Sequence, residues 1–341
     1  MSTDPPGSKR PPNTPTIRDV ATKAGVSIST VSHTLSGKRP ISEATRRRVL
    51  DAIDALNYST NALAVSMRRG RSGLIGMIIR PRDAIRGSLG GTDNFLRLIG
   101  AAAVNSLEQG WGLVHIPNTS EGFDATLPVE GYIIASPYFE DAVLAQALRT
   151  GLPVVTIDGV PEDSSIDPEW NVHVDYEGGI AQAISLLTEL EEIPAALIVG
   201  TEENHWRRAI RNTLSQAYRG RPELLTEISL YEGEGVSGGR KTAETLLDRG
   251  FRRFFVAASR FGVGVTQAAR ARGLSVPEDV EIVSFTDSRM AEVNRPPLTS
   301  VDLMLDEAGH RGVELMIARL EGSPLEPSPV TTQVHRRSST R

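Results

Sequence analysis

Near the N-terminus, two short helices are predicted with only a tight turn between them, and this pair constrains the fold more than any other stretch. Thr16 followed by Asp19 forms a T-x-x-D capping signal, and apolar residues at helical spacing continue to Gly25. Ser27 can cap a second helix immediately afterwards. Because such short helices joined by A-G-V-S cannot stack antiparallel, the sequence predicts a steeply crossed helix-turn-helix.

A third helix is predicted after its cap at Ser42, with Val49, Ile53 and Leu56 on its apolar face. Spacing alone leaves two interpretations equally open, a DNA-binding module or any small three-helix bundle. Charge favours DNA binding, because residues 1–73 contain 12 Lys and Arg against 5 Asp and Glu, whereas the rest of the chain contains 25 against 37.

This stretch carries a family resemblance. T-I-R-D-V-A-x-x-A-G-V-S-x-S-T-V-S-x-x-L-S-G, followed by I-S-E-A-T-R-x-R-V-L-x-A-I, resembles the DNA-binding head of the LacI/GalR (lactose-repressor) family of bacterial transcription regulators, and N-A-L-A-V-S-M-R lies where that family has its hinge helix. The resemblance implies that residues 28–33 enter the major groove of a roughly palindromic operator and that paired hinge helices enter the minor groove. DNA contacts are then expected from Thr16, Ser27, Ile28, Ser29, Thr30, Ser32, His33, Asn61, Ala64 and Met67.

The N-terminal part of the chain divides into three segments. Residues 1–15 are polar and Pro-rich, which predicts a disordered tail, and residues 16–60 form the predicted head. Residues 61–72 are a hinge helix or linker, too short to be stable alone. His33 stands where the family commonly has Arg, and Met67 where it usually has Leu, so an operator sequence cannot be transferred from relatives.

From Leu74 onward, short apolar runs alternate with helical stretches, the pattern of parallel sheets covered by helices on both faces. The runs are too many for one sheet, so two doubly wound lobes with a ligand-binding cleft are predicted. P-V-V-x-I-D at 153–158 and G-L-x-V-P-E-D-V-x-I-V-S-F at 273–285 resemble the periplasmic-binding-protein-like core of the same family. The predicted fold class is therefore α/β, a helix-turn-helix head and hinge helix followed by a bilobed core at 73–341.

The resemblance assigns residues of about 73–165 and 298–322 to the first lobe, and about 166–297 and 323–341 to the second. One departure from the family is expected. Relatives usually insert a helix between the runs at 112–116 and 131–135, but this chain has two prolines and no helical stripe there, so that helix is shortened or lost.

The cleft also departs from the family. Sugar-responsive members present an Arg, an Asn-Asp pair and an Asp, whereas this chain has Trp206, Arg260 and Thr286 at the corresponding positions. The expected effector contacts are Phe95, Asp175, Trp206, Arg260 and Thr286. An added aromatic ring and an added cation predict a flat or anionic effector rather than a neutral sugar. Alternatively, Arg260 faces solvent or pairs with Asp175 or Asp287, and the cleft binds nothing.

Signals for catalysis are weak. G-E-G-V-S-G at 233–238 fits G-x-G-x-x-G, but the next strand ends in Ala258 and Ser259 rather than in the required acidic residue. The chain has no Cys, and its six His lack ligand spacing. We therefore expect no enzyme activity, no catalytic residue, no metal site and no cofactor.

The sequence predicts a cytoplasmic, homodimeric transcription regulator, most simply a repressor, which binds double-stranded operator DNA and a small-molecule effector. The sequence shows no signal peptide. It also shows no apolar run that approaches the roughly 18 residues needed to span a membrane. One alternative is a ligand-independent DNA-binding or architectural regulator with a degenerate effector pocket. Another is a transport-type solute-binding protein, which should have a signal peptide and no basic head.

Overall fold

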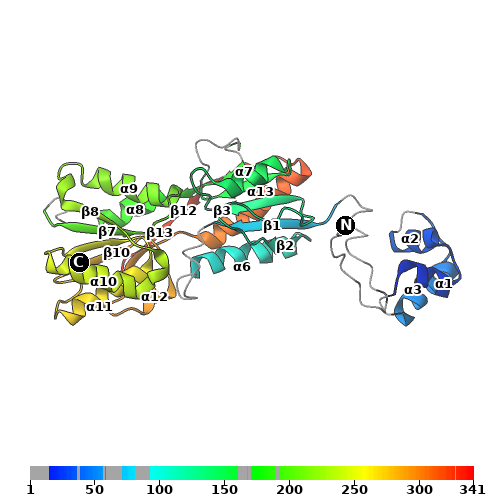
Figure 1. Ribbon diagram of the computed structural model, residues 1–341, viewed down its shortest axis with the longest axis horizontal. Coiled ribbons are helices and arrows are strands. Elements are labelled where there is room, and N and C mark those ends of the chain that lie inside the picture. The colour runs from blue at the N-terminus through cyan, green and yellow to red at the C-terminus, as the bar shows by residue number, and fades with distance from the viewer. Residues whose placement is uncertain are drawn as a thin grey trace, which may run out of the picture. The chain divides into compact units, whose positions relative to one another are not determined.

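The computed structural model describes residues 15–36, 39–56, 58, 71–80, 93–159, 167, 170–188, 192–326 and 328–341. The chain divides into two compact units, Met1–Ser72 and Gly73–Arg341 (Figure 1). The predicted hinge contacts Asn61, Ala64 and Met67, and residues 1–14 of the predicted tail, lie outside the described residues.

The described part of the first unit forms three helices, α1 (Ile17–Ala24), α2 (Ile28–Ser36) and α3 (Glu43–Ala55). The predicted capping box is present, since Thr16 and Asp19 each accept a hydrogen bond from the backbone of the other. Ser42 caps α3 as predicted. Buried residues from all three helices form one small core, which consists of Val20, Ala21, Ala24, Val31, Val49 and Ala52.

The first lobe of the second unit is built on a five-stranded parallel sheet of order β2-β1-β3-β4-β5. Its strands are β1 (Leu74–Ile79), β2 (Gly112–His115), β3 (Gly131–Ala135), β4 (Val154–Ile157) and β5 (Asn171–Val172). Alternate side chains of β1 enter different cores. One core includes residues of α6 (Asp93–Glu108) and α13 (Leu305–Glu321), and the other includes residues of α7 (Ala142–Arg149). No helix separates β2 from β3, as predicted.

The second lobe is built on a six-stranded sheet of order β13-β11-β10-β9-β7-β8. Its strands are β7 (Ala195–Val199), β8 (Leu225–Ser229), β9 (Arg253–Val256), β10 (Glu281–Ser284), β11 (Thr299–Asp302) and β13 (Gln333–His335). All neighbours are parallel except β11 and β13, which are antiparallel. A separate parallel pair joins β6 (Val174–Asp175) to β12 (Val330–Thr331).

Helices cover both faces of this second sheet. Residues of α8 (Tyr176–Ser185) and α9 (His205–Ala217) share one core with it. Residues of α10 (Gly235–Asp248), α11 (Ser259–Ala271) and the short α12 (Arg289–Val293) share another. Two short 3-10 helices, η3 (Pro222–Leu224) and η4 (Glu232–Glu234), flank β8. No helix in the described part of the chain is long and apolar enough to span a membrane.

The predicted fold class is confirmed, but two lobe boundaries need correction. The segment from 298 was assigned to the first lobe, yet β11 pairs with β10 and β13 and so belongs to the second sheet. The segment from 166 was assigned to the second lobe, yet β5 pairs with β4 at the edge of the first sheet. Both strands lie directly beside a crossing between lobes, where a short apolar run is compatible with either sheet.

Candidate functional site

Helix α2 and its cap residue Ser27 present six of the ten side chains that were predicted to contact DNA. The Ser27 hydroxyl accepts a hydrogen bond from the Thr30 amide at 3.1 Å and thereby caps the helix. Ser27, Ile28 and Ser29 are exposed, and Ile28 packs into no core cluster. An exposed Ile at the start of a capped helix has no structural role in the head, so this end of α2 is available for contact with a partner.

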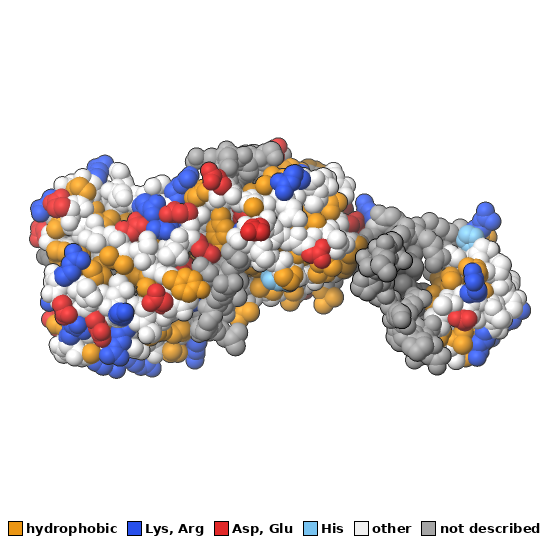
Figure 2. Space-filling model, viewed as in Figure 1, with side chains coloured by type: hydrophobic (Ala, Val, Ile, Leu, Met, Phe, Trp, Pro, Cys, Tyr) orange, Lys and Arg blue, Asp and Glu red, His pale blue; other side chains and the backbone are white. Residues whose placement is uncertain are grey.

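A shallow hollow between α2 and α3 combines hydroxyl groups with basic side chains. It is lined by Ser27, Thr30, His33 and Thr45 together with Arg39 and Arg48. Hydroxyl and guanidinium donors on one surface suit phosphate oxygens. Basic side chains are also seen on the surface of the head in Figure 2.

Thr16 and Ser32 differ from the exposed group. The Thr16 hydroxyl donates to Asp19 at 2.7 Å, so the helix cap already uses it. Its hydrogen bond is also the largest cause of the lowered pKa of Asp19. Ser32 and His33 are half-buried, and His33 Nδ1 has no hydrogen-bond partner within the described segments. The DNA contacts of all these residues remain predictions.

The second candidate site is a cavity of about 90 Å³ at the carboxyl ends of the strands of both lobes. Four of the five predicted effector residues line it, namely Phe95, Trp206, Arg260 and Thr286. Asp175 is the exception and requires a correction. Its carboxylate caps α8 by accepting a hydrogen bond from the Gly178 amide at 2.9 Å, and it does not line the cavity.

Arg260 lies in the cavity wall with only 4% of its surface exposed, and its partner is an acidic residue that the sequence did not suggest. Its Nη2 lies 2.8 Å from Oε2 of Glu232, which belongs to η4. The alternative interpretation required Arg260 to face solvent or to pair with Asp175 or Asp287. Its observed partner is instead Glu232. The pairing offsets the cation, which weakens the case for an anionic effector.

Sequence reasoning missed Asp158 and Ser136, which end β4 and β3 at the cavity. Both have a positive φ in the left-handed region, 79° at Asp158 and 51° at Ser136. Ser136 Oγ donates to Asp158 Oδ2 at 2.6 Å. Non-glycine residues in this conformation cost energy and cluster at functional sites. The available signal was an Asp directly after the buried run P-V-V-T-I, at the ligand-binding end of a parallel strand.

Burial dominates the electrostatics of Asp158. It raises the pKa of this carboxyl to about 7, although hydrogen bonds from the Ser136 and Tyr176 hydroxyls act in the opposite direction. Among the residues that the structure describes, none donates a hydrogen bond to Asp158 Oδ1. Asp158 thus brings a buried carboxylate with one unused oxygen to the cavity.

Aromatic rings form another part of the wall. Tyr176 and Trp206 meet edge to face, with ring centroids 4.7 Å apart and an interplanar angle of 63°. Phe95 of α6 lines the same cavity. The cavity therefore combines one buried carboxylate, one internal ion pair and three aromatic side chains.

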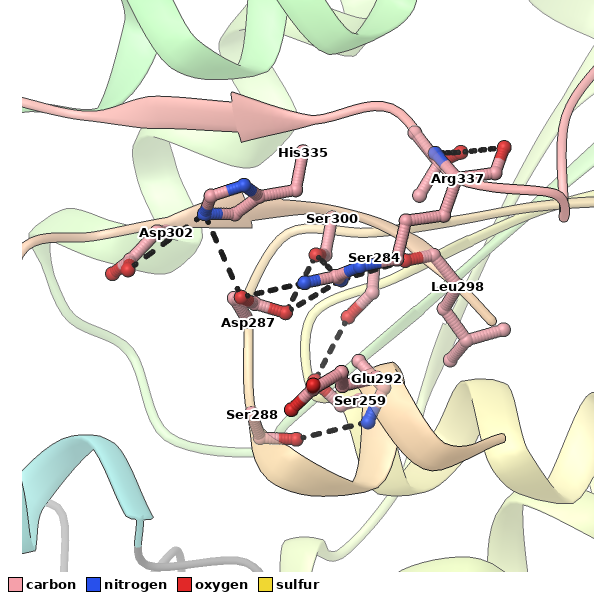
Figure 3. A network of polar contacts seen from close by, with 12 residues as sticks. Ser259, Ser284, Asp287, Ser288, Glu292, Leu298, Ser300, Asp302, His335 and Arg337 are labelled. Carbon is pink, nitrogen blue, oxygen red and sulfur yellow. Dashed lines mark hydrogen bonds and ion pairs between the residues drawn. The ribbon is translucent and has the colours of Figure 1, made fainter. Parts of the chain in front are cut away.

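A polar network in the second lobe lies beside the cavity (Figure 3). Arg337 binds Asp287 through both oxygens, at 2.8 and 3.1 Å, and His335 lies between Asp287 and Asp302. Burial alone would raise the pKa of Asp287, but hydrogen bonds from Arg337 and Ser300 outweigh it and lower the pKa.

In the first lobe, Arg97 of α6 extends this network. It contacts both oxygens of Asp302 at 2.9 and 3.0 Å, and it also contacts Asp306 of α13 at 2.7 Å. The spacing of Asp287, Asp302 and His335 would suit a metal ion. Because each carboxylate already has an arginine partner, the cluster is better described as an ion-pair network.

A latch joins the lobes at another point and is defined here as Tyr138 and Phe139 of the first lobe with Glu202, Glu203, Asn204 and Arg208 of the second. Tyr138 and Asn204 form an antiparallel bridge, and the Phe139 amide donates to the Glu203 carbonyl at 3.4 Å. The Tyr138 hydroxyl donates to Glu202, and the Arg208 guanidinium lies 3.8 Å from the centre of the Phe139 ring. Both networks therefore connect the lobes through direct side-chain contacts.

Two family matches cover most of the two units. Residues 16–61 match the family of bacterial regulatory proteins described as the lacI family, and residues 193–340 match a periplasmic binding protein-like domain. The repressor PurR of Glaesserella parasuis serovar 5 (strain SH0165) is 27% identical over 338 residues, covering 94% of each chain. The regulator CelR of Thermobifida fusca is 28% identical over 340 residues, covering 94% of this chain and 96% of CelR.

Solved structures have the same fold. The complex of the regulator CelR with cellobiose has a TM-score of 0.65 at 25% identity, covering 95% of this chain and 99% of that one. A Lac repressor dimer bound to operator and the anti-inducer ONPF has a TM-score of 0.77 at 22% identity, covering 96% and 99%. The helix-turn-helix head thus belongs to the lacI family of bacterial regulatory proteins, the core contains a periplasmic binding protein-like domain, and the relatives matched over nearly the whole chain are transcriptional regulators.

Proposed function

We propose that this chain is a cytoplasmic transcriptional repressor that binds a palindromic operator as a homodimer. A small molecule that occupies the core cavity either lowers or raises the affinity for the operator. The observation that carries the proposal is the exposed, capped start of α2 at Ser27, Ile28 and Ser29, beside a hollow that contains arginines. Such a helix end fits the major groove, while the arginines contact the phosphates.

The dimer surface that we propose is the outer face of α6. Leu96, Val104 and Leu107 on this face are 52%, 57% and 77% exposed, and the spacing places them along one side of the helix together with Gly100. Figure 2 shows hydrophobic side chains gathered over α6. A row of exposed apolar residues on a regular helix suits packing against a second copy. The Lac repressor of the same fold is a dimer, which supports pairing of two copies.

Coupling between cavity and dimer surface follows from the position of Arg97. It lies on α6 and binds Asp302, the last residue of β11 in the second lobe, as well as Asp306 in the first. A ligand that moves the second lobe would pull on Asp302 and so on the dimer helix. Two conformations that differ in this ion pair would give the ligand differential affinity, which allosteric control requires.

The proposal is tested by selecting duplexes from a random DNA pool with the full chain, at several salt concentrations. We expect a two-fold symmetric motif and affinity that falls steeply with salt, because bound phosphates release counterions. The Ser29→Ala and His33→Ala variants should select a different motif. The core of residues 73–341 alone should bind none of the duplexes. A motif without symmetry, or equal retention by the core alone, would overturn the proposal.

The ligand-independent alternative is favoured by one observation, namely that Arg260 is already paired with Glu232 in a cavity of only about 90 Å³. It predicts that no metabolite changes either the unfolding temperature or the affinity for the selected duplex. A metabolite that changes both would exclude this alternative.

A further inference from the structure

The cavity contains a carboxylate whose hydrogen bonding is incomplete. Asp158 is 4% exposed, and Ser136 donates to only one of its two oxygens. The other oxygen, Oδ1, has no hydrogen-bond donor in the described part of the chain. An ionised carboxylate in a poorly solvated position is costly unless a donor or a cation accompanies it. A ligand that brings a donor or a cation to Oδ1 should therefore bind more tightly than a ligand that brings an acceptor.

The charges of the lining argue against an anion. Among the described residues that line the cavity, the ionisable acids and bases are Asp158, Glu232 and Arg260, apart from the Tyr176 phenol. Glu232 and Arg260 form an ion pair at 2.8 Å and offset each other. Ionisation of Asp158 therefore leaves an excess negative charge, which attracts a cation and repels an anion.

Helix N-termini at the cavity would favour an anion if their amides were unused, but at three of them an amide already donates to a side chain of the protein. Asp175 caps α8 and Asn204 caps α9. At the start of α11, the Ser259 amide donates to the Thr286 hydroxyl at 3.1 Å. These three helix ends thus do not require an anionic ligand.

The aromatic side chains provide a second attraction for a cation. Tyr176 lines the cavity with Asp158 and meets Trp206 edge to face, and Phe95 belongs to the same lining. Aromatic faces attract ammonium groups, and cages of such rings recognise them in many proteins. A carboxylate combined with aromatic rings in one small cavity is a suitable site for a protonated amine.

From these contacts we propose that the effector is an amine whose ammonium group donates to Asp158 Oδ1 and lies against the aromatic wall of the cavity. The inference rests on the proposed function, because it names the ligand class of the same effector site. A cavity of about 90 Å³ is small beside ordinary ligand pockets of about 300–1,000 Å³, so the amine end of the ligand is small.

Binding should also depend on pH. The pKa of Asp158 is raised to about 7, with burial as the main cause and the nearby Glu177 charge acting in the same direction. The Tyr176 hydroxyl faces the carboxylate, and its own pKa is raised further from neutrality. Because the carboxylate is the form that attracts an ammonium group, the affinity for an amine should increase between pH 6 and pH 8.

The test uses the full chain and sets of three small probes that share a skeleton. These sets are benzylamine, benzyl alcohol and benzoate; isobutylamine, isobutanol and isobutyrate; and putrescine, butanediol and succinate. Binding is measured by calorimetry and by the shift in unfolding temperature at pH 6 and pH 8. We expect at least one amine to bind about tenfold or more tightly than the alcohol and carboxylate of its set, as a charge-assisted hydrogen bond implies.

Two variants identify the carboxylate responsible. Asp158→Asn should lose that preference, while Asp124→Asn, which removes an exposed carboxylate from the same lobe, should keep it. The pH dependence is measured on the wild-type chain and so does not rely on either variant folding.

The inference is overturned if no amine in the panel binds, if in every set the alcohol or the carboxylate binds as tightly as the amine, or if the preference for the amine survives in Asp158→Asn. The same preparation is assayed with the selected duplex. Retained duplex binding with failure of every amine would reject the amine inference alone, whereas loss of duplex binding would reject the proposed function.

Discussion

The buried carboxyl of Asp158 should make the stability of the core fall as pH rises, opposite to the usual effect of an ion-paired Asp. Its pKa is 3.8 in the reference state and about 7 in the folded chain, chiefly because of burial. Between these values the folded state keeps a proton that the unfolded state releases, so the free energy of unfolding decreases with pH and levels off above about 7. At about 1.4 kcal/mol per pH unit, this interval corresponds to roughly 4 kcal/mol.

Asp158→Asn removes this titration and keeps the shape and the acceptor for Ser136. At pH 8 we expect the variant to be more stable than the wild type by up to about 4 kcal/mol, and near pH 4 we expect the difference to vanish. Urea unfolding of the full chain, followed by circular dichroism at several pH values, measures the difference.

Asp124→Asn is the matched control. Asp124 is fully exposed, and hydrogen bonds from Thr126 lower its pKa, so it contributes stability above its reference pKa and loses this contribution at acid pH. The stability difference between Asp124→Asn and the wild type should therefore change only slightly with pH, and in the opposite direction. A constant stability difference between Asp158→Asn and wild type from pH 4 to pH 8 would refute the assignment of a raised pKa to Asp158.

Other substitutions test the remaining parts of the structure. Thr16→Ala should destabilise the head by about 1 kcal/mol through loss of the helix cap, measured as a lower unfolding temperature of the head in calorimetry; an unchanged temperature would contradict this role. Leu107→Glu should weaken dimerisation in sedimentation experiments, and an unaltered association constant would exclude the outer face of α6 as the dimer surface. Arg337→Ala removes the arginine that binds both oxygens of Asp287 and should lower the free energy of unfolding in urea by about 2 kcal/mol. Arg289 forms an exposed ion pair with Glu292, so Arg289→Ala should lower it by less than about 0.5 kcal/mol. Equal costs for the two arginine variants would show that burial of the Asp287 network does not matter.

Features that depend on neighbouring residues could be predicted from the sequence. The capping box of Thr16 and Asp19 and the cap at Ser42 use contacts three residues apart, and the alternation of strands and helices predicted two doubly wound lobes. Four of the five effector positions that the family resemblance implied also line one cavity.

Features that depend on distant partners could not be predicted in the same way. Arg260 and Glu232 are 28 positions apart, and nothing in their spacing indicates an ion pair. Ser136 and Asp158 end different strands, so their contact exists only once β3 and β4 pair. The error at β11 has the same origin, since its sheet is decided by pairing with β10 and β13 and not by its own apolar pattern.

The latch links the effector response to contacts that lie mostly outside the cavity. It consists of backbone contacts of Tyr138 and Phe139 with Asn204 and Glu203, reinforced by the stacking of Arg208 on Phe139. None of these five residues except Asn204 lines the cavity. Contacts of the latch hold the lobes together without touching the ligand, so they add to the stability of the joined lobes and to the barrier for parting them on that side. We expect substitutions in the latch to shorten the time for which a transcriptional response lasts after the metabolite disappears, and to raise the concentration needed to trigger it.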